Sequence, residues 1–380
     1  MDFALSPEQE LLKKEARHFL DSECPKKVIT EIEQSESGYS VEIWKKMSQL
    51  GWLGLVLPEE YGGVNGSLLD LAVLFEELGK TALPSPLFCT LLLGALPVLD
   101  GGNEKQKKEI LPQVAAGNLI LTMALSELET DYNPDSIKTE ARQKNEYYEI
   151  DGTKLFVPYA GVADYMLVVA RTREATQDSR GITVFLIATR SSGVTVTPLR
   201  TSAGDRQFEV VLDRVKAPRD DILGKLNEGW TLVERALLRA TAIQCVQTVG
   251  IMQQALSMTA SYTSTRIQFD RPIGSFQAVQ HRLANMLTDV EGARWLSYRA
   301  VYLLDKGLPA AKAVAIAKAW TSDACQRVAY GAQHLHGGIG MHLEYDLHFY
   351  FRWAKAMELN LGPAPYHLAR IEPELRANLC

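Results

Sequence analysis

The sequence predicts an α+β protein of three domains, in the order helical, β and helical. Two changes of pattern along the chain predict this order. Apolar residues recur at helical spacing in the first part, alternate with polar residues in the middle, and return to helical spacing from Trp230 onward. We therefore expect an N-terminal helical domain at 1–118, a β domain at 119–228 and a C-terminal helical domain at 229–380.

The first domain begins with a clear helix start. Ser6 can cap a helix, Pro7 stands at its first position, and Gln9 lies three residues after the cap, which is the pattern of a capping box. The apolar residues that follow recur at helical spacing up to Leu20. We expect this helix to end before Pro25, because proline cannot continue it.

A later helix of the same domain carries two adjacent acids. Glu76 and Glu77 lie near the end of an apolar run from Leu68 to Leu78. Because charged side chains are mostly exposed unless they are paired, we interpret both acids as part of a solvated helix face.

The middle domain is expected to consist of strands. Asp151-Gly152 separates the runs 147–150 and 153–157, and Asp-Gly is a favoured two-residue turn between strands, so this passage predicts a hairpin. Further strands are expected at 165–170, 181–188, 193–199 and 207–215.

Helical spacing then returns and continues to the C-terminus. Apolar and small residues between Leu232 and Gly250 fall on one side of a helix, and the stretch from Leu303 to Ala319 is rich in alanine. Such small residues are typical of helices that pack closely in a bundle.

Composition excludes several classes of protein. The net charge of −6 disfavours nucleic acid as a partner. The chain has no run of about 18 apolar residues and no basic, apolar start, so we expect a cytoplasmic protein without a membrane span. The five cysteines are far apart and form no C-x-x-C pair, which argues against a disulfide framework and a zinc site: Cys24, Cys89, Cys245, Cys325 and Cys380.

The segment 264–281 holds the strongest sign of ligand binding. It reads as the end of one helix, a tight turn containing Pro272 and Gly274, and the start of the next helix. Arg266 lies in this segment beside an aromatic residue and two amides. A guanidinium binds phosphate oxygens through parallel hydrogen bonds, so the turn suits an extended, phosphate-bearing cofactor.

A second segment, 333–341, contains the paired glycines Gly337 and Gly338. Paired glycines allow the backbone to lie against a ligand where side chains would block it. Four histidines lie in or near this segment, but their spacing lacks the pattern of a metal site, so no metal is predicted there: His334, His336, His342 and His348.

These segments resemble the acyl-CoA dehydrogenase family. The segment 264–281 is similar to the family's Arg-x-x-Phe-Gly-x-x-Ile-x-x-Phe-Gln-x-x-Gln-His, and 333–355 is similar to its glycine segment and its Arg-Asp-Ala-Lys passage. The passage 51–63 is similar to the family's Gly-x-x-Gly-x-x-x-Pro-Glu-x-Tyr-Gly-Gly linker. The resemblance covers essentially the whole chain, and it implies a middle β-barrel or β-sandwich domain and a C-terminal four-helix bundle.

The resemblance also implies an FAD-dependent oxidoreductase. In that family the flavin takes a hydride from Cβ of an acyl-CoA thioester while a carboxylate removes the Cα proton. It further implies electron-transfer flavoprotein as the electron acceptor and the catabolism of fatty acids or other lipids as the setting. FAD lies between subunits, so that one chain's β domain holds the flavin end and a neighbouring chain reaches the pyrophosphate and adenine.

The resemblance assigns some residues to the chain's own FAD and others to the FAD of a neighbouring chain. Ser126 would belong to the chain's own flavin seat. The residues that would reach across to a neighbour's FAD are Arg266, Gln268, Phe269, Ile273, Phe276, Gln277, His334, Gly337 and Gly338.

The flavin seat of this chain departs from the family's pattern. Relatives read Thr-Glu-Pro-x-Ala-Gly-Ser-Asp where this chain reads Ser126 to Asn133, so the Gly-Ser pair becomes Asp131-Tyr132. An acidic, bulky pair is expected to repel and crowd a diphosphate. The family's Trp-Ile-Thr becomes 156–158, which ends in Pro158, and proline has no N–H to donate to the flavin.

The catalytic base is also missing. The family's usual position for a glutamate falls on Leu361, and the position that a minority use falls on Ala240. Neither side chain can take a proton, so no catalytic residue is assigned. Glu358 and Glu234 are the nearest carboxylates, and we interpret both as surface residues. Arg239 could replace the family's arginine beside the second position only through a register shift.

The residues that differ from the family's pattern are those that would serve the subunit's own flavin. The residues that match it are those that would reach a neighbour's flavin. This asymmetry predicts the base-lacking partner of a heteromeric acyl-CoA dehydrogenase, an α2β2 assembly with a catalytic homologue. Three alternatives stay open: a self-sufficient dehydrogenase with an unusual base such as Glu358, an enzyme for another reaction such as an elimination, and a structural or binding homologue without flavin or CoA. The identity of the acyl-CoA is not predicted.

Overall fold

The order of elements along the chain is helical, then β, then helical, which confirms the predicted fold class. The computed structural model describes residues 4–128, 132–173 and 179–377. Their contacts divide the chain into two compact units. The helical unit consists of Met1–Thr30, Ser67–Leu83 and Thr241–Cys380, and the sheet unit consists of Glu31–Gly66 and Pro84–Ala240.

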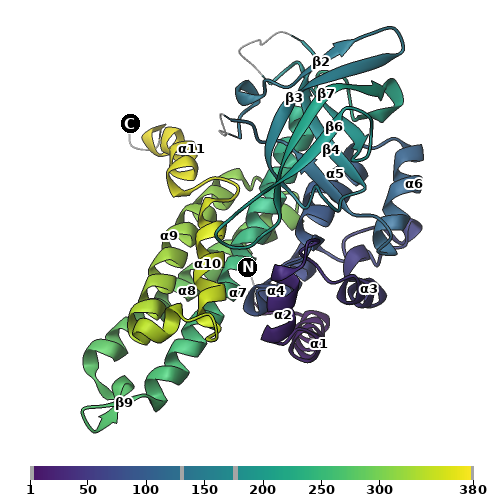
Figure 1. Ribbon diagram of the computed structural model, residues 1–380. Helices are drawn as coiled ribbons and strands as arrows, with labels where there is room; N and C mark the ends of the chain where they lie inside the picture. Colours follow the sequence, from purple (N-terminus) through teal and green to yellow (C-terminus); the bar gives the residue numbers. More distant parts are fainter. Residues whose placement is uncertain (1–3, 129–131, 174–178, 378–380) are drawn as a thin grey trace. The chain divides into compact units, whose positions relative to one another are not determined.

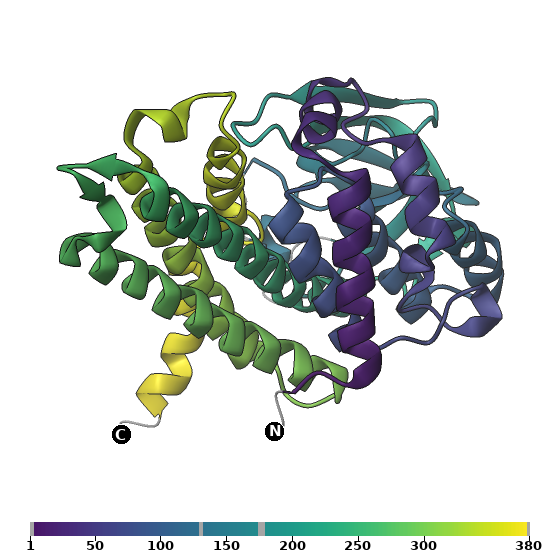
Figure 2. The same cartoon turned by 90° about the horizontal axis from the view of Figure 1, so that it is seen from below.

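Long helices build the helical unit. α8 and α9 lie side by side, and α10 and α11 pack on α9 (Figures 1 and 2). The bounds are α1 Pro7–Glu23, α4 Leu68–Thr81, α8 Gln277–Asp305, α9 Ala311–His336, α10 Leu347–Leu359 and α11 Ala364–Ala377; α7, Trp230–Thr265, belongs to this unit from Thr241 on, and α2, Lys26–Gln34, as far as Thr30.

The predicted start of α1 is confirmed. The backbone N–H of Gln9 donates to the Ser6 hydroxyl at 3.2 Å, and the Gln9 side chain accepts from the Ser6 N–H at 3.1 Å. Pro7 occupies the first helical position, as expected. The capping box therefore fixes where the chain enters this helix.

The centre of α7 is a core helix. Every residue from 241 to 250 is buried, so this stretch has no solvent-facing side. Gly79 of α4 and Gly250 of α7 make the crossing possible. A Cβ on Gly79 would lie 2.0 Å from the Gln247 carbonyl oxygen, and one on Gly250 would lie 2.1 Å from the Glu76 carbonyl oxygen. Only glycine permits two helix backbones to approach this closely.

The expectation that Glu76 and Glu77 lie on a solvated helix face is wrong. Their exposed fractions are 3% and 1%. Glu76 accepts hydrogen bonds from Arg294 and, at 2.8 Å, from the Tyr298 hydroxyl of α8. Glu77 pairs with Lys80 at 2.6 Å. Burial is tolerated because each carboxylate has a cation beside it.

The sheet unit contains the strands. Hydrogen bonding connects them in the order β6-β7-β3-β2-β4-β5-β8, and β1 pairs with β4. Their bounds are β1 Leu121–Ala124, β2 Glu140–Gln143, β3 Tyr147–Pro158, β4 Tyr165–Arg171, β5 Ile182–Ala188, β6 Val194–Leu199, β7 Gln207–Pro218 and β8 Ile222–Leu223. The unit's helices include α3 Val41–Gln49, α5 Leu96–Gly101, α6 Glu104–Ala115 and the π-helix Cys89–Ala95. Four of these strands, β4 to β7, confirm the expected ones.

The hairpin predicted at Asp151-Gly152 is wrong. β3 runs through these residues as one strand, paired to β7 on both sides of a register shift between Ile150 and Gly152. The glycine is needed because a Cβ there would lie 2.5 Å from Oγ1 of Thr139. Asp-Gly therefore serves a β-bulge in this chain and not a turn.

In the described part of the chain, no helix is both long enough and apolar enough to cross a membrane.

Candidate cofactor site

The turn between α7 and α8 is a small hairpin. β9, Ile267–Gln268, pairs with β10, Arg271–Pro272, and the two residues between them both have positive φ, 54° at Phe269 and 62° at Asp270. Two left-handed residues are what a tight type I′ turn requires. An aromatic residue in this conformation is strained by about 1–3 kcal/mol, and residues strained in this way cluster at functional sites.

Aromatic contacts support the hairpin from one side. The Phe269 ring meets the Phe276 ring edge-on at 6.0 Å between centroids, and the Arg271 guanidinium lies over Phe276 at 4.1 Å. Phe269 itself is 85% exposed. The chain therefore holds a large aromatic ring outward, where a partner or ligand can cover it.

The backbone of Arg266 is held at both of its polar groups. Its N–H donates to the Tyr262 carbonyl at 2.9 Å, and its carbonyl accepts from the Ile273 N–H at 2.8 Å. Within the described residues, its guanidinium makes no hydrogen bond or ion pair. A fixed backbone with an unpaired guanidinium is suited to bind a phosphate.

The remaining hairpin residues flank Arg266. Gln268 and Gln277 are exposed, and the Gln268 amide donates to the Ile267 carbonyl at 2.9 Å. Ile273 and Phe276 are half-buried and anchor the turn.

The glycine segment follows α9 directly. Gly337 ends the helix with φ 64° and ψ −141°, a conformation that other residues rarely adopt, and the 3₁₀ helix Gly337–Met341 follows. A Cβ on Gly338 would meet no atom of the described residues within 4 Å, and its φ is not in the left-handed region. The chain's own packing therefore does not require glycine at 338.

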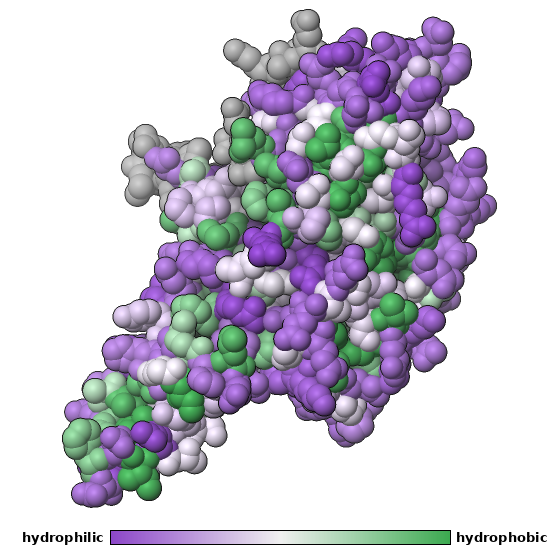
Figure 3. Space-filling model, viewed as in Figure 1, coloured by the Kyte–Doolittle hydropathy of each residue, from purple (hydrophilic) through white to green (hydrophobic). Residues whose placement is uncertain are grey.

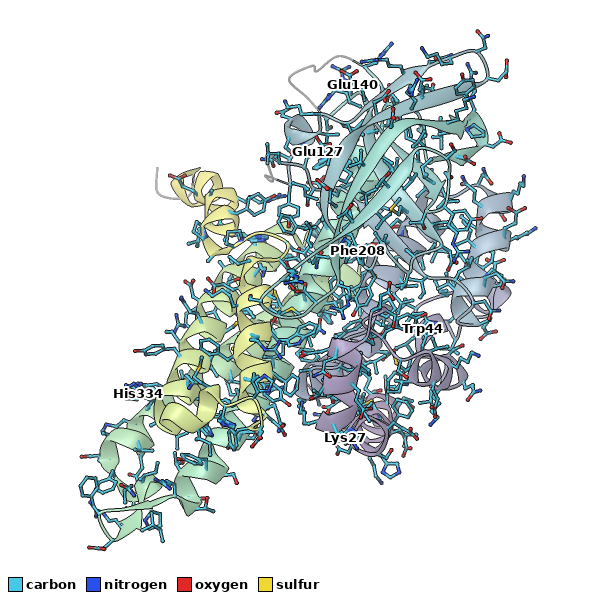
Figure 4. The ribbon with its side chains drawn as sticks, viewed as in Figure 1. Lys27, Trp44, Glu127, Glu140, Phe208 and His334 are labelled. Atoms are coloured by element: carbon cyan, nitrogen blue, oxygen red, sulfur yellow. The ribbon has the colours of Figure 1, made fainter. Side chains whose placement is uncertain are left out.

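The structure brings these two segments to one end of the helical unit, which we call the tip: residues 266–277 and 337–343. The Tyr262 ring, one turn before Arg266, stacks on the His336 ring at 4.5 Å between centroids with 23° between planes. His334, exposed on α9, lies near this end (Figure 4). Apolar side chains gather on this end of the surface (Figure 3). Those exposed by 44% or more are Ile267, Phe269, Ile339, Met341 and Leu343.

The predicted flavin seat lies in the sheet unit. The Ser126 carbonyl accepts from the Leu155 N–H at 2.8 Å, so the two segments that the resemblance pairs at the flavin are adjacent. Lys154, wholly buried, donates to Glu127 at 2.7 Å. Burial lowers the pKa of Lys154 to about 8, and the ammonium, against burial, lowers the pKa of Glu127. Sequence reasoning missed this pair, because 27 residues separate its members and neither lies in a pattern that indicates the other.

Three residues of this seat depart from the pattern that the resemblance assigns to it. Pro158 has no N–H, and its carbonyl is occupied by the Thr122 hydroxyl at 2.6 Å. Phe156 has φ 54° and is 56% exposed. Tyr132, where the family has a small residue, has φ 46°. The Asp131 of the predicted repulsive pair lies outside the described residues.

The two positions at which the resemblance places a catalytic base hold apolar side chains. Ala240 is fully buried in α7. Leu361 is half-buried with φ 58°, and its carbonyl accepts from His367 at 2.9 Å. Neither can remove a proton.

Three charged residues stand near these positions in the sequence: Glu358, Glu234 and Arg239. Glu358 is not fully exposed: its side chain is 19% exposed and pairs with Lys355 at 2.5 Å. Glu234 is exposed on α7. Arg239 binds Asp100 at 2.6 Å.

Metal ligands do not gather in the described part of the chain, where no group of three or more His, Cys, Asp or Glu could hold an ion. His336 and His348 are buried, and His334 and His342 are exposed. Cys24, Cys89, Cys245 and Cys325 are buried free thiols, and Cys380 lies outside the described residues.

Comparison with known proteins gives full-length matches. The family models described as acyl-CoA dehydrogenase N-terminal, middle and C-terminal domains match residues 6–118, 122–215 and 227–375. The chain is 31% identical to the acryloyl-CoA reductase (NADH) of Anaerotignum propionicum, over 99% of this chain and 96% of that protein. It is 28% identical to the caffeyl-CoA reductase-Etf complex subunit CarC of Acetobacterium woodii, over 94% and 95%.

A solved structure is similar over its whole length. A chain of the ChsE4-ChsE5 complex from Mycobacterium tuberculosis matches with a TM-score of 0.90 and 31% identity, covering 99% of both chains.

Proposed function

Because the chain belongs to the acyl-CoA dehydrogenase family, whose members are FAD-dependent oxidoreductases acting on the CH–CH bond of acyl-CoA, we propose that it serves this reaction as a base-lacking subunit. Its partner would be a catalytic homologue in an α2β2 complex. FAD, when bound, supplies the acceptor for the hydride that leaves the acyl chain.

One observation carries this proposal. The two positions where the family places its carboxylate hold Leu361 and Ala240, while Arg266 at the tip has a guanidinium that no described residue pairs. A chain that oxidised acyl-CoA alone would need a base and a flavin seat. A chain that completes a partner's site needs the tip alone.

Each tip residue would make a different contact with a partner's FAD. Arg266 would bind the diphosphate through charge-assisted hydrogen bonds, and the exposed ring of Phe269 would cover an apolar part of the cofactor. Gly338 would let the backbone approach closely, since no side chain stands there. The remaining candidates would line the same contact: Gln268, Ile273, Phe276, Gln277, His334 and Gly337.

The relatives support the proposed partners. The similar chain from Mycobacterium tuberculosis is part of the ChsE4-ChsE5 complex, and CarC is a subunit of a caffeyl-CoA reductase-Etf complex. We propose electron-transfer flavoprotein as the acceptor and the cytoplasm as the location. Ser126 would belong to the chain's own flavin seat, in which Pro158 offers no N–H donor. We also propose that the boundaries between the three domains lie near residues 118 and 228.

Flavin absorbance tests the proposal. We expect the chain expressed alone to be colourless, and its complex with a homologue that carries the glutamate base to hold about one FAD per pair. Arg266→Ala should weaken FAD retention in the complex about tenfold or more, the cost of losing a charge-assisted contact. Arg299→Ala, an exposed arginine of α8 outside the tip, is the matched control and should leave retention unchanged. A chain that purifies alone with tightly bound FAD and oxidises acyl-CoA would overturn the proposal.

A further inference from the structure

The tip is assembled from two segments that are far apart in the sequence. Arg266 follows α7, and Gly337 and Gly338 follow α9, so neither half is positioned by its neighbours along the chain. A ligand that touches both halves needs them held in one arrangement, because each misplaced contact weakens binding.

Tyr262 connects the first half to the protein interior. Its carbonyl accepts the Arg266 N–H at 2.9 Å, so the two residues lie on the same turn of helix. Its ring stacks on His336, with centroids 4.5 Å apart. The position of the Tyr262 ring is therefore coupled to the direction in which Arg266 leaves the helix.

His336 connects the second half. It is the last residue of α9, directly before Gly337, and it is 4% exposed. Its Nδ1 lies 2.8 Å from the Ala332 carbonyl, which can only accept, so Nδ1 carries the proton. The Nε2 lone pair then accepts from the Tyr345 hydroxyl at 3.0 Å. Both ring nitrogens are bonded, which fixes the plane on which Tyr262 stacks.

Tyr345 closes the cluster. Its ring meets the Tyr262 ring edge-on at 6.4 Å, and its N–H donates to the His342 carbonyl at 3.0 Å. The segment after the glycines is thus attached to the same ring pair. Burial lowers the pKa of His336, which keeps the imidazole in the neutral form that this arrangement needs.

We propose that Tyr262, His336 and Tyr345 form an aromatic clamp that positions Arg266 and the Gly337–Gly338 backbone together for one phosphate-bearing cofactor. His336 is a positioning residue, since it acts through the residues on either side of it. The inference rests on the proposed function for the identity of that cofactor, FAD in a partner's site. The coupling between the two halves of the tip does not depend on it.

Hydrogen exchange of the chain alone tests the coupling. His336→Ala removes the stack and both hydrogen bonds, and we expect faster exchange at 262–268 and at 337–343 together. His336→Phe keeps a stacking ring and should restore most of the protection at 262–268. Faster exchange confined to 337–343 would overturn the clamp, because it would show that α7 does not depend on His336.

A milder variant keeps the test usable if His336→Ala does not fold. Tyr345→Phe removes one hydroxyl, and it should also speed exchange in both segments. Tyr330→Phe is the matched control, because Tyr330 is 65% exposed on α9 and lies outside the clamp. Unchanged exchange in Tyr345→Phe would contradict the proposal.

FAD retention in the complex tests the cofactor role separately. We expect His336→Ala to weaken retention about tenfold and His336→Phe by less than about threefold. If Arg266→Ala weakens retention and His336→Ala does not, the clamp is wrong and the proposed function stands. If Arg266→Ala has no effect, the proposed function fails, and the exchange experiment still decides the coupling.

Discussion

Nε2 of His367 donates a hydrogen bond to the carbonyl oxygen of Leu361 across 2.9 Å. This contact holds the loop between α10 and α11, where Leu361 and Gly362 have φ of 58° and 94°. The resemblance places the family's usual base at Leu361. In this chain a buried imidazole holds the loop, and position 361 carries no carboxylate.

His367 should make the protein sensitive to acid. Burial first, and the charges of Lys318 and Arg370 in addition, lower its pKa from 6.5 to about 4. The unfolded chain therefore takes up this proton as the pH falls below 6.5, and the folded chain does not until about pH 4. The contribution of neutral His367 to the free energy of unfolding is fully present above pH 6.5. Roughly 3 kcal/mol of it is lost as the pH falls from 6.5 to about 4.

The variant His367→Gln separates this effect from other titrations. An amide N–H can still reach the Leu361 carbonyl, but it does not titrate. Urea unfolding at several pH values between 7 and 4 should show the wild type losing more stability than the variant, by roughly 3 kcal/mol. His18→Gln, at an exposed position of α1, should behave as the wild type. A difference between wild type and His367→Gln that does not change with pH would contradict the prediction.

The buried carboxylate of Glu76 should be costly to remove. Glu76→Ala leaves Arg294 without its buried partner and the Tyr298 hydroxyl without its acceptor. We expect a loss of about 3–5 kcal/mol in the free energy of unfolding. Thermal and urea unfolding measure this loss.

An exposed ion pair provides the control for that measurement. Glu228 and Lys225 lie 3.7 Å apart with side chains 63% and 84% exposed. Glu228→Ala should therefore change stability by less than about 0.5 kcal/mol. A loss of less than about 1 kcal/mol for Glu76→Ala would show that the buried network contributes little.

Local signals in the sequence predicted local structure well. The Ser6 cap and Pro7 placed the start of α1, and alternation placed the strands β4 to β7, because these features depend on residues a few positions apart. Asp151-Gly152 misled the prediction, since the same pair fits a turn or a bulge. Pairing of β3 with β7, some 60 residues later, decides between them.

Distant partners could not be predicted from spacing. Arg294 lies 218 residues after Glu76, and nothing near either residue indicates that they meet. The same holds for the stack of Tyr262 on His336. The two halves of the tip were predicted as ligand-binding segments from their own residues, but the contact that joins them is a property of the folded helices.

Gly338 and Gly250 should respond to alanine in opposite ways. A Cβ on Gly250 would lie 2.1 Å from the Glu76 carbonyl oxygen, so Gly250→Ala must separate α4 from α7 and should cost about 1–3 kcal/mol or more. A Cβ on Gly338 would meet no described atom within 4 Å, so Gly338→Ala should leave the unfolding transition within about 0.5 kcal/mol.

The same Gly338→Ala variant should nevertheless weaken FAD retention in the heteromeric complex, because the new methyl group occupies the space through which the backbone approaches a ligand. Thermal unfolding of the chain alone and flavin content of the complex, measured on one preparation, give the two readouts. Unchanged flavin content in Gly338→Ala would mean that no ligand lies against this glycine, whereas lost stability would mean that the packing of the tip, and not a cofactor, requires it.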